Sequence, residues 1–183
     1  MLIQLVTQHP EAIGPILRQT PAWVWGLLAA LVALGVSQLR DRTASLARMS
    51  IMPAAMTAFS LWGTASAFGS SPLAGQIAIV WLGAAAVAFA LLAPGRAKAE
   101  YDAATRTFHL PGSVVPMLLI LGIFSVKYVV GVELAMAPRL VADTQYALTV
   151  AALYGAFTGI FVGRATRLWK LVRGTQGAAA LAA

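Results

Sequence analysis

The 183-residue chain contains no cysteine. Without a thiol it has no disulfide, no thiolate ligand for a metal, no CxxC redox pair and no covalent attachment site for haem. Acidic residues are also few, with six aspartates and glutamates against 13 lysines and arginines. All six acids fall in expected loops or at helix ends, whereas proton relays in transporters place a carboxylate inside a membrane span. Thiol chemistry is therefore excluded, and the placement of the acids argues against proton coupling.

Charge of either sign is rare, at 10% of the residues, while 60% are hydrophobic and the mean hydropathy is +0.80. A water-soluble domain would not stay in solution with this balance, and apolar runs of about 20 residues recur along the chain. We predict a membrane protein with one helical domain over residues 1–173 and a low-complexity tail over residues 174–183. The formal charge of +7 does not indicate nucleic acid, because the basic residues form short clusters at the ends of apolar runs.

The apolar runs predict an all-α fold, a bundle of five transmembrane helices. We place these helices at residues 21–38, 49–68, 73–93, 113–134 and 145–163. Thr20 can cap the first helix, with Pro21 at its first position. Between the third and fourth helices, the stretch "AEYDAATRTFHL" predicts a short β-hairpin, because Thr107 and Phe108 favour extended backbone. Ser113 then caps the fourth helix. The first 19 residues lack the pattern of a secretory signal peptide and can form a short segment on the membrane surface.

The distribution of lysine and arginine predicts the orientation. Only Arg18 and Arg139 fall on one side, and Lys127 lies inside the fourth helix. Ten residues share the other side: Arg40, Arg42, Arg48, Arg96, Lys98, Arg106, Arg164, Arg167, Lys170 and Arg173. This excess assigns the amino terminus to the outside of a bacterial inner membrane, and the hairpin and carboxyl terminus to the cytoplasm. Trp23, Trp25 and Trp169 fall at helix ends, where an interfacial aromatic belt is expected.

The two histidines, His9 and His109, lie on opposite sides of the membrane in this topology. They therefore cannot ligate one haem or metal ion together. Nothing in the chain resembles a nucleophile with its base, a phosphate-binding loop or a pair of catalytic carboxylates. We expect no metal, no cofactor and no enzymatic activity.

Three glycines stand four residues apart in the expected fifth helix, at Gly155, Gly159 and Gly163. Such a ridge lets another backbone approach closely, which is how helices associate in lipid. The third helix offers a similarly smooth partner around Gly83 and Ala88. We favour packing within one chain, with a seam between copies of a homo-oligomer as the alternative.

Lys127 lies in the apolar run "LGIFSVKYVVGVEL". It is six residues before Glu133, about 9 Å below the outer end of the fourth helix, so its stem can reach the headgroups. Three aromatic residues fall at a similar depth on other helices: Trp62, Trp81 and Tyr154. An ammonium facing these rings would form a buried cation site or the floor of an outward-facing ligand cavity. Both interpretations remain open.

The chain also shows an order of parts: "SQLRDR", "MSIMPAAM", an uncharged turn, "AEYDAATRTFHLPGS" and "LLILGIFSVKYVVG". This layout, over residues 25–131, resembles the CcdC-like family of small multi-pass bacterial membrane proteins. That family is named for its association with cytochrome c biogenesis genes and is largely without an assigned activity. The resemblance singles out Arg48, Pro53, Ser113 and Lys127. Because the chain lacks cysteine, it implies at most an accessory role in cytochrome assembly.

Together these observations predict a non-catalytic integral inner-membrane protein, an accessory or scaffold subunit. Its basic cytoplasmic face would meet anionic membrane lipid or a membrane-protein partner, and no nucleic acid. The alternative is a small transporter or channel with a cavity around Lys127. Five helices are few for alternating access, so that alternative requires a homo-oligomer with the glycine ridge facing a neighbouring copy.

Overall fold

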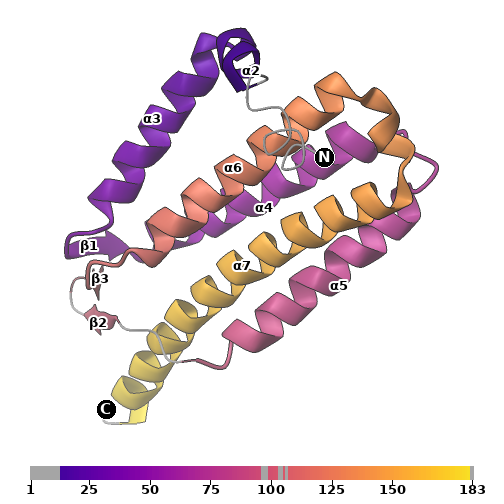
Figure 1. Cartoon of the computed structure of the whole chain (residues 1–183). Coiled ribbons are helices and arrows are strands. Elements are labelled where there is room, and N and C mark those ends of the chain that lie inside the picture. The colour runs from indigo at the N-terminus through magenta and orange to yellow at the C-terminus, as the bar shows by residue number, and fades with distance from the viewer. Residues whose placement is uncertain (1–12, 96–98, 103–104, 106, 182–183) are drawn as a thin grey trace. The chain divides into compact units, whose positions relative to one another are not determined.

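The structure is a computed structural model, and it describes residues 13–95, 99–102, 105 and 107–181. The chain divides into two compact units. Unit 1 comprises Met1–Arg40 and Ser113–Val141, and unit 2 comprises Asp41–Gly112 and Ala142–Ala183. Both consist mainly of helices, and the short strands β1, β2 and β3 belong to unit 2 (Figure 1).

Unit 1 is built from helices α2, α3 and α6. Their bounds are Ile13–Gln19, Ala22–Ser37 and Val115–Met136, and a 3-10 turn at Pro138–Ala142 follows α6. The carboxyl end of α3 packs closely on the start of α6, since a Cβ added to Gly35 would lie 2.7 Å from Met117 Cγ. At the same end, the Ser113 N–H donates to the Gln38 carbonyl oxygen over 3.0 Å.

The predicted capping role of Thr20 is wrong. Pro21 takes the position before α3, and no side chain caps this helix. The Thr20 hydroxyl instead donates to the Ile16 carbonyl oxygen over 2.8 Å, and it shares a second hydrogen bond with the Tyr128 hydroxyl over 2.7 Å. The Thr20 hydroxyl is therefore used in a tertiary hydrogen bond with Tyr128 and does not cap α3. This bond attaches the end of α2 to the middle of α6.

Unit 2 is built on the long helix α7. Its elements are β1 (Arg42–Ser45), α4 (Leu46–Phe68), α5 (Ala74–Leu92), β2 (Glu100–Asp102), β3 (Thr107–Leu110) and α7 (Thr144–Leu181). Helix α5 lies along α7 (Figure 1), and α4 also packs against α7. The buried core of this unit includes Phe68, Ile77, Trp81, Ala151, Tyr154, Phe161 and Ala165.

The predicted hairpin is present. Strands β2 and β3 pair antiparallel with Tyr101 opposite Phe108, and the two ring centroids are 5.0 Å apart. The sequence did not predict β1, which pairs antiparallel with the other edge of β3. Ala44 and Phe108 are buried on one face of this sheet, while Thr43 and His109 are exposed on the other. A four-residue strand in a charged stretch has little local signal, because its partner is more than 60 residues away.

The helix bounds differ from the predicted bounds mainly in α7. This helix continues past the expected end at Gly163 to Leu181, because the end of an apolar run marks where a helix leaves lipid and not where it stops. Helix α4 begins three residues earlier than expected, at Leu46, where the Ser45 hydroxyl accepts the Arg48 N–H over 3.4 Å.

In the part of the chain that the structure describes, three helices are long and apolar enough to cross a membrane: Ala74–Leu92, Val115–Met136 and Thr144–Val172. These helices are those of a membrane protein. Helix α3 is equally apolar but has only 16 residues, and α4 has 23 residues but carries Arg48 and several hydroxyl side chains. Membrane crossing by α3 and α4, which the five-span topology requires, stays a prediction.

Candidate functional site at the basic end of unit 2

A hydrogen-bonded node joins the three helices of unit 2. The Trp81 indole N–H donates to Ser60 Oγ over 3.1 Å, and this hydroxyl donates to the Tyr154 carbonyl oxygen over 3.2 Å. The Thr158 hydroxyl donates to the same carbonyl over 3.0 Å. All four residues are buried. Trp81 and Tyr154, two of the predicted site residues, thus lie together, and the side chain that connects them is Ser60, which sequence reasoning missed.

The other two predicted site residues do not belong to this node. Trp62 lies elsewhere on α4, and Lys127 lies in unit 1. Trp62 follows Ser60 by two residues, so it points to a different side of α4, and 72% of its surface is exposed. Lys127 is a half-buried residue of α6, in unit 1. The site that would combine Lys127 with Trp62, Trp81 and Tyr154 therefore stays a prediction.

The glycine ridge of α7 faces α5 of the same chain. Gly155 lies against the Trp81 carbonyl, and Gly159 lies against the Ala85 carbonyl. A Cβ added to Gly163 would lie 3.2 Å from Leu92 Cβ. The ridge is therefore occupied by α5, and it offers no free face to a second copy.

Three side chains in the carboxyl-terminal half of α7 bond to the neighbouring helices α4 and α5. Arg167 Nε donates to the Leu92 carbonyl, and Lys170 Nζ donates to the Ala93 carbonyl over 3.2 Å. Both carbonyls stand at the carboxyl end of α5, where helices leave acceptors unpaired and where cations are favoured. The Trp169 indole N–H donates to Ser50 Oγ over 3.1 Å, which ties the same stretch of α7 to the start of α4.

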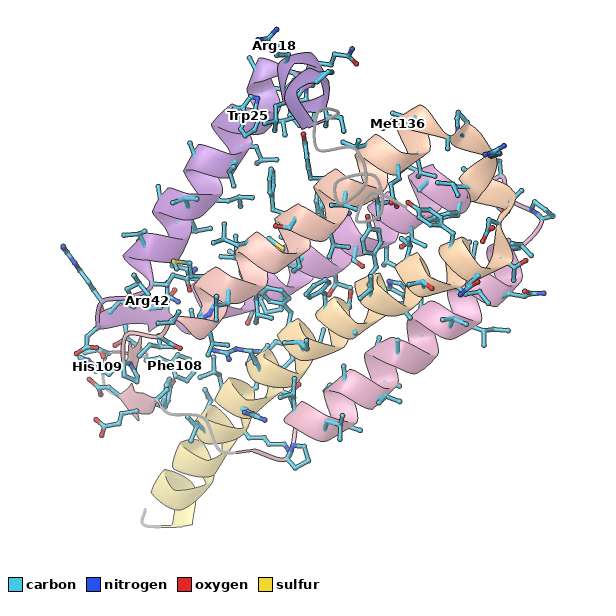
Figure 2. All side chains as sticks on the ribbon, in the orientation of Figure 1. Arg18, Trp25, Arg42, Phe108, His109 and Met136 are labelled. Carbon is cyan, nitrogen blue, oxygen red and sulfur yellow. The ribbon has the colours of Figure 1, made fainter. Side chains whose placement is uncertain are left out.

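The sheet adds a further cation to this end. Arg42 lies on the side of the sheet that carries Ala44, and Figure 2 shows it near Phe108 and His109. Its partial burial, together with the nearby charge of Arg48, lowers the pKa of Arg42 below its usual range. We call the basic residues of unit 2 whose side chains the structure describes the basic end; they are Arg42, Arg48, Arg164, Arg167 and Lys170.

The opposite end of unit 2 has no basic residue. No lysine or arginine occurs over residues 49–95 or 142–163. There Asp143 accepts the Tyr146 N–H over 2.8 Å at the start of α7. Near the basic end, Asp41 accepts the Gly112 N–H over 2.7 Å, and Asp102 accepts the Thr105 hydroxyl over 2.8 Å. The positive charge of unit 2 is therefore concentrated at one end of its long helices.

Several predicted residues are placed elsewhere or not described. His9, Arg96, Lys98 and Arg106 lie outside the described residues, as do residues 1–12, and Arg40 belongs to unit 1. Among the described residues, no three histidine or acidic side chains gather to hold a metal ion.

The residues singled out by the CcdC-like resemblance lie in both units. Arg48 is exposed in the first turn of α4, and Pro53 lies inside that helix. The Ser113 hydroxyl accepts the Val115 N–H over 3.3 Å at the start of α6. The resemblance itself stays a prediction.

Comparison with known proteins gives one match. No curated protein and no solved structure matches the chain. The model of a family described as "Family of unknown function (DUF6622)" matches residues 1–179, and the chain therefore belongs to this family.

Proposed function

We propose that this protein is a non-catalytic integral protein of the bacterial inner membrane, an accessory or scaffold subunit whose basic end lies in the cytoplasm. The observation that supports the proposal is the one-sided charge of unit 2. Five basic residues from β1, α4 and α7 share one end, and none lies at the other. Lysine and arginine are enriched in the cytoplasmic parts of membrane proteins, which supports a cytoplasmic position for this end.

The five-span topology includes α4, whose polar side chains are compatible with lipid. Thr57 donates to the Pro53 carbonyl, and Thr64 donates to the Ser60 carbonyl, over 2.8 and 3.0 Å. In lipid each polar group needs a partner within the protein, and these hydroxyls have one. The 16 residues of α3 extend about 24 Å, which is short of the roughly 30 Å hydrocarbon core, and local thinning of the bilayer accommodates such a helix.

The scaffold role follows from how the polar side chains of unit 2 are used. Ser60, Trp81 and Thr158 hold helices together in the interior. At the basic end, Arg48 is exposed and the Trp169 side chain is 41% exposed, while the hydrogen bond from Trp169 to Ser50 joins α7 to α4. A rigid, charged and accessible surface is suited to holding a partner and provides no catalytic constellation.

The alternative of a transporter or channel around Lys127 receives no support from contacts within either unit. That alternative requires copies to meet through the glycine ridge, and α5 already covers this ridge.

Site-directed crosslinking tests the scaffold role, because a chain without cysteine gives clean single-cysteine variants. Ala47→Cys places a thiol at an exposed position beside Arg48, and Ile79→Cys places one on the exposed outer surface of α5. In native membranes we expect a crosslinked product with another membrane protein from Ala47→Cys and none from Ile79→Cys. Recovery of uncrosslinked monomer from both variants would contradict the scaffold role.

A further inference from the structure

Three basic residues follow one another at intervals of three on α7. We call Arg164, Arg167 and Lys170 the α7 basic stripe. Residues three apart on a helix are surface neighbours, with Cβ atoms about 5–6 Å apart, and Arg164 and Arg167 accordingly act on each other as like charges. No acidic residue occurs anywhere in α7 to offset them. The stripe is therefore a concentrated positive charge on one rigid helix.

The partners within the chain compensate this charge only in part. Arg167 and Lys170 donate to backbone carbonyls at the carboxyl end of α5, which carry a partial negative charge and no full one. Arg164 is half-buried, and among the described residues it makes no hydrogen bond or ion pair. A partly buried cation without a partner is costly, and its guanidinium retains all five N–H donors. An anionic oxygen from outside the chain would satisfy them.

The position of Arg164 along α7 indicates the source of that oxygen. Arg164 lies 20 residues beyond Thr144, which corresponds to about 30 Å of helix. This length equals the thickness of the hydrocarbon core, so Arg164 reaches one interface when Thr144 stands at the other. Trp169, whose side chain is partly exposed, lies five residues further on, as expected of an interfacial aromatic residue. The anion available at this depth is the phosphate of a lipid.

We propose that the α7 basic stripe binds the phosphate of an anionic phospholipid, with Arg164 as its main ligand. The fork of the guanidinium matches phosphate oxygens in a bidentate arrangement, and Arg167 and Lys170 add positive charge on the same stretch of α7. The excess of positive charge favours an anionic headgroup over a zwitterionic one. The inference rests on the proposed function only for the assignment of the site to the cytoplasmic leaflet.

Lipid titration followed by native mass spectrometry tests the site on the full chain in a neutral detergent. The probes are phosphatidylglycerol, phosphatidylcholine and inorganic phosphate. We expect phosphatidylglycerol to bind about tenfold more tightly than phosphatidylcholine, and Arg164→Gln to weaken its binding about tenfold, as the loss of one charge-assisted contact predicts. Equal affinity for the two lipids would overturn the inference, and so would displacement of phosphatidylglycerol by inorganic phosphate at an equal concentration.

Two further variants keep the test decisive. Arg139→Gln removes an exposed charge of unit 1, outside the stripe, and we expect it to bind phosphatidylglycerol like the wild type. An equal loss in Arg139→Gln and Arg164→Gln would show a general charge effect and overturn the site.

If Arg164→Gln does not fold, Arg164→Lys, which retains the charge but loses the fork, replaces it. We expect Arg164→Lys to bind about threefold more weakly than the wild type, and unchanged binding would contradict the role of Arg164.

This experiment fails independently of the proposed function. Lipid binding in detergent does not depend on how the chain is threaded through a membrane or on any protein partner. A failed titration therefore removes the lipid site and leaves the scaffold role, whereas absence of a crosslinked partner removes the scaffold role and leaves the lipid site.

Discussion

Gly155 of α7 lies against the backbone carbonyl oxygen of Trp81 in α5, with no room for a Cβ between them. The Trp81 side chain extends in turn to Ser60 of α4. Trp81 therefore contacts both of the other long helices of unit 2, through its backbone on one side and its indole on the other. A missing side chain on α7 and a hydroxyl on α4 thus both contribute to the packing around Trp81.

Alanine at Gly155 or Gly159 is expected to destabilise the protein. The new Cβ meets a backbone carbonyl at either position, and a backbone cannot move aside as cheaply as a flexible side chain. Overpacking of this kind typically costs about 1–3 kcal/mol. The measurement is the midpoint of unfolding in one detergent.

Gly83→Ala is the matched control, because a Cβ at Gly83 meets no atom within 4 Å. In a helix interior alanine is favoured over glycine, so we expect this variant to be as stable as the wild type or slightly more so. A melt in which Gly155→Ala and Gly83→Ala behave alike would contradict the packing described here.

Ser60→Ala tests the three-helix node. This change removes the acceptor of the buried Trp81 N–H and one donor to the Tyr154 carbonyl, so we expect a loss of about 1–2 kcal/mol in the free energy of unfolding. Ser66→Ala is its control, because that exposed hydroxyl donates only to the nearby Gly63 carbonyl. Equal stabilities of the two variants would show that the node contributes nothing.

Tyr128→Phe tests the attachment of α2 to α6. The substitution keeps the ring, which stacks on Phe124 with centroids 6.2 Å apart, and removes only the hydroxyl bonded to Thr20. We expect a loss of about 0.5–1.5 kcal/mol and faster proteolysis before residue 20. Unchanged cleavage rates would indicate that another contact holds α2.

Lys127→Met separates the two interpretations of the lysine in α6. If the ammonium reaches the headgroups, the variant keeps the volume of the stem and melts at the same or a higher temperature. If aromatic rings and hydroxyls hold the ammonium, the loss is on the order of 1–2 kcal/mol. We expect the loss, and a raised or unchanged melting temperature rules out the buried cation site.

The long helices were predictable because each depends on a local property of the chain. A long apolar run favours a helix, which satisfies its backbone within the run, and the five helices α3, α4, α5, α6 and α7 begin close to the predicted starts. The glycine ridge was visible for a similar reason, since the absence of a side chain directly limits how closely another backbone can approach. Strand β1 and the tertiary role of Thr20 depend on partners far along the chain, which spacing does not reveal.

The hydrogen-bonded node around Ser60 could not be predicted either, because its partners also lie far along the chain. Ser60 is one of several hydroxyl residues in α4, and Thr57, Thr64 and Ser66 all bond within their own helix. Only the packing of three helices distinguishes Ser60 from them. The basic residues were recognised as topology signals, but the carbonyls that Arg167 and Lys170 bind become evident only once α5 and α7 lie together.

The side of the membrane on which the basic end lies is the central claim of this account. Two reporters fused to the carboxyl terminus measure it directly: a fluorescent protein that matures only in the cytoplasm, and a phosphatase that is active only in the periplasm. The polarity of unit 2 predicts fluorescent cells with the first fusion and no phosphatase activity with the second. An active phosphatase together with dark fluorescent-protein fusions would place the basic end outside and contradict the proposed topology.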